Sequence, residues 1–253
     1  MRDRTGRVPA VEWHGRPPPA PSQPNPHASV ALGPDRWLSS PEAGRVVSSR
    51  IRRADALTVV VAFEVDVLKQ RGPARIVSLS LDPDVRNFTL GQDGTDVIVR
   101  LRTPVTGMNG EARTLRVVGA LTTRGPHWAA FTYDGATQCL SVDGRRSCTS
   151  LTPGIAMAAM LDRDLARRGL PQVWDATFYA VAFLPLGVLL RRCRVGPLRA
   201  DGLRRTFLLL PLVCAGGAVA LELVSASRPL RAIRMDAILA GTAWACCGVV
   251  LSA

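Results

Sequence analysis

The chain has 253 residues, 47% of them hydrophobic, and a formal net charge of +12. This length accommodates one soluble domain beside a small membrane region, because single domains usually contain ~100–200 residues. Much of the positive charge flanks long apolar segments, where basic side chains set topology and contact anionic lipid, so the composition favours membrane lipid over nucleic acid as a partner.

Residues 1–29 are rich in proline and poor in apolar side chains. This composition predicts an extended or disordered linker. The charged residues 1–7 are not followed by the apolar core of a signal peptide. Because later segments indicate an exported domain, two explanations stay open: a first transmembrane helix encoded upstream of the given start, which we favour, or a degenerate remnant of a longer gene.

Residues 30–152 have the pattern of an antiparallel β-sandwich. Short segments rich in β-branched and aromatic residues alternate with Gly, Asp, Asn and Pro at the spacing typical of such folds. The expected strands cover residues 57–65, 74–81, 87–91, 96–101, 115–121, 127–133 and 138–142. Asp134-Gly135 and Asp143-Gly144 are strong hairpin signals, because a type I′ turn needs a positive φ at both central residues.

The second hairpin predicts a disulfide bond. With a two-residue turn at Asp143-Gly144, Cys139 lies opposite Cys148. By alternation this is a non-hydrogen-bonded pair, in which the Cα atoms approach to ~4.5 Å, within the range that a disulfide accepts. An oxidising compartment would favour the bond. We expect no metal site, because the sequence lacks the Cys and His spacing of zinc sites.

Residues 153–171 connect the sandwich to the apolar C-terminal third. The pattern of residues 155–168 is that of a helix, with Gly169 and Pro171 as stop signals. The same segment could instead contain a last strand of the sandwich, and the sequence leaves this alternative open.

Residues 172–253 form the predicted membrane region, with three apolar segments at 173–190, 206–224 and 237–253. Each is close to the ~17–25 residues that a helix needs to cross a bilayer. The loop at 191–205 carries six arginines, and short Arg-rich loops stay on the cytoplasmic side. The pattern therefore predicts a multi-pass protein of the cell membrane, with a cytoplasmic loop 191–205 and an extracytoplasmic sandwich.

Five short runs resemble the laminin G-like, concanavalin A-like lectin and glucanase domains. They are RIVSLS at 75–80, RNFTLGQDG at 86–94, VRLRTP at 99–104, FTYDG at 131–135 and VDG at 142–144. The resemblance implies a jelly-roll sandwich that binds carbohydrate or another polar ligand. The candidate ligand-binding residues are Asn87, Gln92, Arg100 and Arg102.

Some sandwiches of this type bind calcium. Asp82, Asp84 and Asp93 could contribute oxygen ligands, but their spacing defines no calcium site. We therefore expect no cofactor.

The segment EVDVLK at 64–69 resembles the start of the catalytic strand of laminarinase-type hydrolases. Such enzymes need a nucleophilic Glu and a second carboxylate ~5–5.5 Å away. Lys69 occupies the position expected for the second Glu. We therefore interpret Glu64 and Asp66 as the exposed face of a strand and expect no glycosidase activity.

The membrane region resembles the VanZ-like family. Asp175, Phe183, Pro185 and Gly187 follow its D-x3-N-x3-F-x-P-x-G pattern, with Tyr179 in place of the Asn. Further along the chain, the family's E…R…D order is followed by Glu222, Arg231 and Asp236.

Carboxylates within apolar spans are costly unless they are paired, which makes them candidates for function. The topology predicts that Asp175, Glu222, Arg231 and Asp236 gather at the outer membrane face. Such a cluster could bind a polar ligand of the envelope. The simpler interpretation, which we favour slightly, is a set of helix ends held by ion pairs.

Together these patterns favour a non-enzymatic, membrane-anchored envelope protein. Its expected partners are membrane lipid and a cell-envelope glycan or protein. The VanZ-like resemblance implies a link to the cell-envelope or glycopeptide response. The alternatives are an intramembrane enzyme that acts on a lipid-linked cell-wall precursor through Glu222, Arg231 and Asp236, and an inactive truncated remnant.

Overall fold

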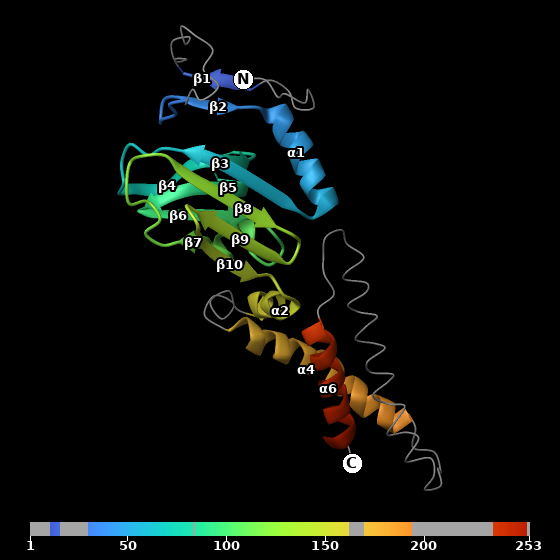
Figure 1. Ribbon diagram of the computed structural model, residues 1–253. Coiled ribbons are helices and arrows are strands. Elements are labelled where there is room, and N and C mark those ends of the chain that lie inside the picture. Colours follow the sequence, from blue (N-terminus) through green and yellow to red (C-terminus); the bar gives the residue numbers. More distant parts are fainter. Residues whose placement is uncertain (1–10, 16–29, 83, 162–169, 194–234, 252–253) are drawn as a thin grey trace, which may run out of the picture. The chain divides into compact units, whose positions relative to one another are not determined.

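The computed structural model describes residues 11–15, 30–82, 84–161, 170–193 and 235–251. The chain divides into two compact units, Met1–Arg53 and Ala54–Ala253. The second unit contains two β-sheets and the helices that follow them (Figure 1).

The first unit combines a small sheet with a helix. Strand β1 (Glu12–His14) pairs antiparallel with β2 (Trp37–Ser39), and helix α1 (Pro41–Ala54) follows. Two expectations need correction here: the segment 1–29 contains a strand, and the sandwich begins at residue 57 instead of residue 30. The helix begins where Ser40 accepts a hydrogen bond from the Ala43 N–H at 3.4 Å, because a Ser at the N-cap satisfies a free N–H of the first turn.

The second unit contains two four-stranded antiparallel sheets. One has the order β10-β9-β8-β3 and the other β4-β5-β6-β7. Their bounds are β3 (Leu57–Phe63), β4 (Gln70–Ser80), β5 (Arg86–Gly94), β6 (Asp96–Leu101), β7 (Leu115–Val117), β8 (His127–Tyr133), β9 (Thr137–Val142) and β10 (Arg145–Ser150). A 3-10 helix, η1 (Met108–Arg113), connects β6 to β7.

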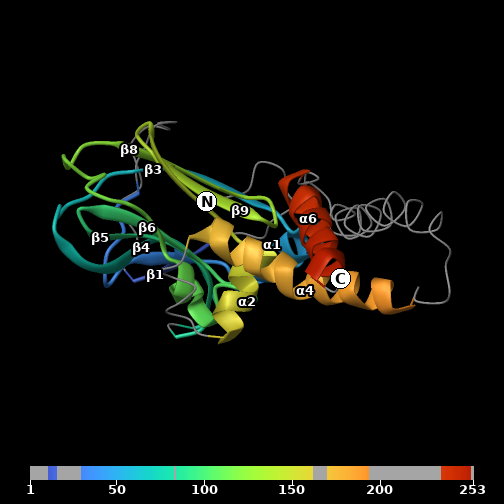
Figure 2. The same ribbon diagram turned by 90° about the horizontal axis from the view of Figure 1, so that it is seen from below.

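The two sheets lie as separate layers (Figure 2) and share one hydrophobic core. Leu90 and Val99 from one sheet and Phe131 and Leu140 from the other are fully buried within it. The Phe88 and Phe131 rings meet across the layers with centroids 5.4 Å apart. The predicted antiparallel sheets are thus confirmed, and each expected strand overlaps an observed one.

The hairpin at Asp143-Gly144 has the predicted register. Asp143 and Gly144 have φ values of 46° and 83°, as a type I′ turn requires. Val142 pairs with Arg145, and Cys139 pairs with Cys148. The structure joins these two cysteines in a disulfide, with Cα atoms 4.1 Å apart.

Helix α2 (Pro153–Leu161) resolves the open question about this connector in favour of a helix as far as residue 161. It contacts helix α4 (Pro171–Cys193), and at this contact the Gly154 N–H donates to the Asp175 carboxylate at 3.1 Å. Helix α4 also packs along α6 (Met235–Leu251), with Tyr179 and Ala245 buried between them.

Three membrane spans were expected, and the described residues contain one helix that is long and apolar enough to be one. Within the described residues, the window Pro171–Leu189 is long and apolar enough to cross a membrane, with a mean hydropathy of 1.3. The apolar part of α6, Ile238–Cys247, is shorter than a span. The expected span 206–224 and the Arg-rich loop from 194 to 205 lie outside the described residues.

Candidate functional site

The outer face of sheet β10-β9-β8-β3 carries mostly small side chains. On β3, Leu57, Val59, Val61 and Phe63 pack on the core. Since successive side chains of a strand point to opposite faces, the intervening residues face outward. Together with their neighbours on β8, β9 and β10 they form what we call the open face: Thr58, Val60, Ala62, Trp128, Ala130, Thr132, Ser141 and Arg146.

Trp128 is the one large aromatic residue of the open face, and 63% of it is exposed. Its cross-strand partner on β3 is Ala62, so the indole ring has no bulky neighbour on that strand. An exposed Trp in a soluble fold is informative, because such side chains are usually mostly covered.

A row of residues crosses the open face beside Trp128. Val60, Ala130, Ser141 and Arg146 are successive partners on β3, β8, β9 and β10. Neighbouring strands are ~4.8 Å apart, so this row is ~14 Å long. It runs from an apolar end at Val60, which is 63% exposed, to the guanidinium of Arg146. The open face therefore suits a ligand that has both an apolar surface and polar groups.

The backbone of Trp128 is held by Asp143, which in turn contacts the buried His127. The Trp128 N–H donates to Asp143 Oδ1 at 2.8 Å, and Asp143 Oδ2 lies 2.6 Å from His127 Nδ1. The other ring nitrogen, Nε2, lies 2.9 Å from the carbonyl oxygen of Thr123. Both nitrogens therefore face acceptors, an arrangement that only the doubly protonated imidazole satisfies.

This arrangement shifts the pKa of both partners. Burial of the imidazole opposes its charge, but the hydrogen bonds to Asp143 and Thr123 outweigh burial and raise the pKa of His127. The hydrogen bonds that Asp143 accepts from His127 and from the Trp128 N–H lower the pKa of Asp143. Because neither ring nitrogen is free to accept a proton from a substrate, we interpret His127 as a positioning residue for Trp128 and the hairpin.

The disulfide lies on the same side of the sheet as the open face. Cys139 pairs with Thr132 on β8 and with Cys148 on β10. The Arg146 Nη2 group lies 3.2 Å from Cys139 Sγ. The bond fixes β9 to β10 next to the row that ends at Arg146.

The four ligand-binding residues that the sequence suggested do not form one site. Gln92 is buried, and its amide donates to the carbonyl oxygens of Val67, Leu68 and Gly94 at 2.7, 3.2 and 2.9 Å. It therefore holds the connection between β3 and β4, and its amide nitrogen is engaged by the backbone. The sequence could not show this, because two of the three partners come from a distant loop.

The other three suggested residues belong to the sheet β4-β5-β6-β7 and its ends. Arg100 Nη1 forms an ion pair with Glu111 Oε1 at 3.1 Å. Asn87 and Arg102 are exposed, and the Arg102 N–H donates to the Asn87 carbonyl at 2.7 Å. Asn87 and Arg102 stay available to a ligand, but away from the open face.

Two of the three acidic residues considered for calcium, Asp82 and Asp93, are engaged elsewhere. Asp82 Oδ1 accepts the N–H groups of Asp84 and Val85 at 2.7 and 2.6 Å. Asp93 Oδ2 pairs with Arg116 Nη2 at 2.7 Å. Among the described residues, no group of three or more His, Cys, Asp or Glu could hold a metal ion.

The segment considered for glycosidase chemistry is not a strand. Strand β3 ends at Phe63, so Glu64 and Asp66 are exposed residues of the following loop. This corrects their expected place on a strand face. The strand ends there because the loop turns toward the amide of Gln92, which binds the Val67 and Leu68 carbonyls.

Of the expected polar membrane cluster, the structure places the side chain of Asp175. It is buried in α4 and caps the first turn of α2 through the Gly154 N–H. Glu222 and Arg231 lie outside the described residues, and Asp236 is described only as part of helix α6.

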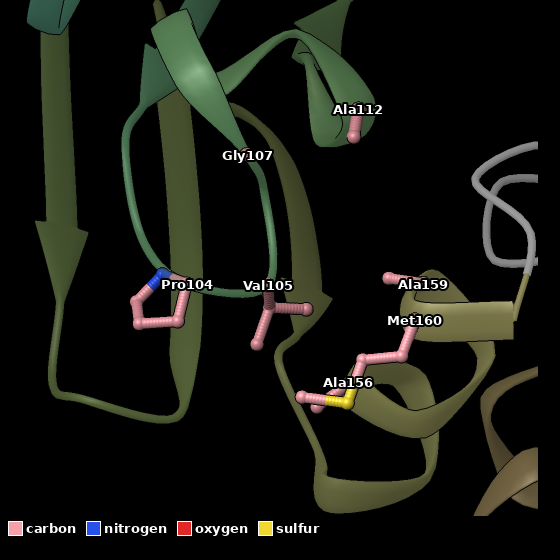
Figure 3. A pocket seen from close by; sticks show the side chains of 7 residues that line it. All are labelled: Pro104, Val105, Gly107, Ala112, Ala156, Ala159 and Met160. Atoms are coloured by element: carbon pink, nitrogen blue, oxygen red, sulfur yellow. The ribbon is translucent and has the colours of Figure 1, made fainter.

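A pocket of about 100 Å³ lies between the loop after β6 and helix α2 (Figure 3). Pro104 and Val105 lie on one side, and Ala156, Ala159 and Met160 of α2 lie on the other. Ligand pockets usually measure ~300–1,000 Å³ and contain a few polar side chains. This pocket is smaller than a usual ligand site, and none of its lining residues has a polar side chain, so the open face is the better candidate.

Fold and site together define two packed antiparallel sheets with one exposed tryptophan on an outer face, followed by apolar helices. A scan against protein-family models, a search of curated proteins and a search of solved structures found no match. The laminin G-like and VanZ-like resemblances therefore stay predictions.

Trp128 was not among the residues suggested by the sequence, although a signal was present. In the segment HWAAFTY the residues His127, Ala129 and Phe131 are the buried set. Trp128 then falls on the outward positions, where strands of a half-exposed sheet usually carry polar residues. A large aromatic residue out of phase with the buried set is the signal.

Proposed function

We propose that the protein is a membrane-anchored envelope protein whose sandwich binds a glycan on the open face. The observation that carries this proposal is Trp128, 63% exposed and surrounded by small side chains. The C–H faces of a sugar ring stack on an indole ring, because both are apolar and flat. Thr58, Thr132, Ser141 and Arg146 supply donors for the hydroxyl or acidic groups at the sugar's edges.

An envelope location is supported by two features. Disulfides form and persist mainly in oxidising compartments, and Cys139 and Cys148 are bonded. In addition, the window Pro171–Leu189 has the length and composition of a membrane span, and only 22% of it is buried. A core helix of a soluble domain would be mostly buried. The laminin G-like and VanZ-like resemblances agree with this proposal.

The ligand proposal is tested by glycan-array binding of the full-length protein in detergent, with peptidoglycan fragments included. We expect Trp128→Ala to weaken binding by about 30-fold or more, because truncating an aromatic anchor commonly costs ~2 kcal/mol or more. Trp128→Phe should retain part of the affinity. Trp37→Ala is the matched control, because Trp37 is also exposed, at 47%, but lies in the first unit.

Equal binding by wild type and Trp128→Ala would contradict the proposal, as would equal losses in the Trp128 and Trp37 variants. The location is tested separately in intact cells with a membrane-impermeant maleimide. We expect Cys139 and Cys148 to be labelled only after reduction. Labelling that needs permeabilised cells would place the sandwich in the cytoplasm and overturn the envelope proposal.

A further inference from the structure

Helix α1 gathers its apolar residues on one side, which Arg50 interrupts, and carries most of its charge elsewhere. The helix carries four arginines, Arg45, Arg50, Arg52 and Arg53, and one acidic residue, Glu42. At about 100° per residue, the apolar residues fall on a single stripe: Ala43, Val46, Val47, Ile51 and Ala54. This is the pattern of a helix that lies at an interface between an apolar and a polar phase.

The charged residues of α1 remain exposed. None of the residues of the helix is buried, and all four arginines are exposed. In the described part of the chain, none of these arginines takes part in a salt bridge. The net charge of +3, four arginines less one glutamate, is therefore not neutralised by neighbouring side chains.

The same unit exposes other apolar side chains just before the helix. Val30, Leu32 and Trp37 are 42%, 46% and 47% exposed. Trp side chains favour the boundary between lipid and water, because the indole ring is apolar with one polar N–H. This observation is independent of the pattern of α1 and indicates the same kind of environment.

We propose that α1 lies on the surface of a membrane and binds anionic phospholipid headgroups. The apolar stripe enters the headgroup boundary, and the arginines contact phosphate. A basic amphipathic helix binds such surfaces through buried apolar area together with attraction to anionic lipid. Charge complementarity selects an anionic surface over a zwitterionic one, since each Arg near an anionic surface contributes about 1 kcal/mol.

The arginines of α1 differ in their distance from the apolar stripe, which gives a matched comparison. Arg50 and Arg53 lie about 40° and 100° from the centre of the stripe, and Arg52 and Arg45 lie about 160° and 180° from it. Arg50 thus lies within the angular span of the stripe and Arg53 at its edge, so these two are the pair whose long side chains can extend outward to the headgroups. The variants Arg50→Gln/Arg53→Gln and Arg45→Gln/Arg52→Gln remove the same charge from the two sides.

The test uses full-length protein in lipid nanodiscs that contain nitroxide-labelled lipid. A fluorophore is attached at Val47→Cys, on the stripe, or at Ser49→Cys, on the polar side, while Cys139 and Cys148 are kept and the other four of the six cysteines are replaced by Ala. We expect quenching at position 47 in discs with phosphatidylglycerol, much less in phosphatidylcholine alone, and little at position 49. Each arginine removed from the lipid side should lower the ratio of docked to undocked helix by ~5-fold.

We expect Arg50→Gln/Arg53→Gln to abolish most of the quenching, and Arg45→Gln/Arg52→Gln to retain it. No quenching at position 47 in either lipid, or equal quenching in both lipids, would overturn the proposal. The proposal would also be overturned if a soluble polyanion changed the fluorescence at position 47 while neither lipid quenched it, because α1 would then bind a different partner.

This inference is separate from the proposed function of the sandwich. Glycan binding should survive the arginine substitutions, and lipid quenching should survive Trp128→Ala. If the C-terminal helices fail to anchor the protein in discs, the same labelled protein is added to preformed vesicles of the two compositions. A failed anchor and a failed helix contact are then distinguishable.

Discussion

Gln138 is a buried polar residue in an apolar setting. It lies on β9, on the side of Leu140 and Val142, and it is fully buried. Neither its Nε2 nor its Oε1 atom has a hydrogen-bond partner among the described residues. Leaving buried polar groups unsatisfied costs about 1–3 kcal/mol. We therefore expect Gln138→Met, which preserves the volume, to raise the free energy of unfolding by about that amount.

Gln92→Met is the matched control for this prediction. The amide of Gln92 donates to three carbonyl oxygens, so its loss should destabilise the fold. Urea unfolding of the full-length variants in detergent checks both. If Gln138→Met destabilises the protein as much as Gln92→Met, Gln138 has an internal partner such as a bound water.

The pair of His127 and Asp143 predicts a pH-dependent stability. The pKa of His127 is raised above its usual 6.5, so the contribution of its charge is fully present below pH 6.5 and is lost as pH rises through the folded-state value. The pKa of Asp143 is lowered below 3.8, so its contribution is present above pH 3.8 and is lost as pH falls through its folded-state value. The pair should therefore stabilise most between these two pH values.

An NMR titration of the His127 ring checks the direction of the first shift. We expect its midpoint above that of an exposed histidine, and we expect His127→Gln to flatten the stability profile above pH 6.5. A midpoint below 6.5 would show that burial outweighs the partners of the imidazole.

At the scale of single residues, the sequence predicted which residues pair across a turn better than it predicted what each side chain contacts. Cys139 and Cys148 could be paired because a two-residue turn fixes which residues lie opposite each other. Gln92 could not be assigned, because its role depends on the Val67 and Leu68 carbonyls, whose position is set by the path of the loop. The exposure of Trp128 depends on what covers the sheet, which no local pattern contains.

At the scale of elements, the contact between α2 and α4 depends on a glycine. A Cβ atom at Gly154 would lie 2.3 Å from the backbone of Trp174 and Asp175. Gly154→Ala must therefore separate the helices and weaken the bond from the Gly154 N–H to Asp175. We expect a loss of about 1–3 kcal/mol, the usual range for overpacking, and faster hydrogen exchange in α2.

Gly125→Ala is the control for the helix contact. A Cβ atom there would meet only the Thr123 hydroxyl, at 3.7 Å, so this change should be nearly neutral. Thermal unfolding and hydrogen exchange of the two full-length variants provide the comparison. Equal stability of both variants would show that α2 and α4 do not pack closely in the protein.

Elements with a strong local signal were predictable, and those defined by distant partners were not. Strands β6 and β8 have the bounds expected from alternation and flanking turn residues. Helix α1 was missed although Ser40-Pro41-Glu42 is a helix start signal, because Ser at the N-cap and Pro at the first helical position favour helix initiation. Strand β1 has only three residues and depends on pairing with β2, more than twenty residues away.

At the scale of the whole molecule, the disulfide makes the free energy of unfolding depend on whether the compartment is oxidising or reducing. Cys139 and Cys148 are separated by 9 residues, and closing a loop of this length restricts the unfolded chain by an entropy worth ~2.5 kcal/mol. The core that joins the two sheets, with Leu90, Phe131 and Leu140 fully buried, does not depend on the bond. We therefore expect Cys139→Ala/Cys148→Ala to fold, with a free energy of unfolding lower by about 2–3 kcal/mol.

Urea unfolding with and without reductant separates the bond from the side chains. Reductant should lower the midpoint of the wild type and leave that of the double variant unchanged. Hydrogen exchange should then increase first at the β9 and β10 amides, because the bond joins these two strands at the end of their sheet. If reductant leaves the wild-type midpoint unchanged, the protein purified from its own membrane lacks the bond, and the argument from the disulfide to an oxidising compartment fails.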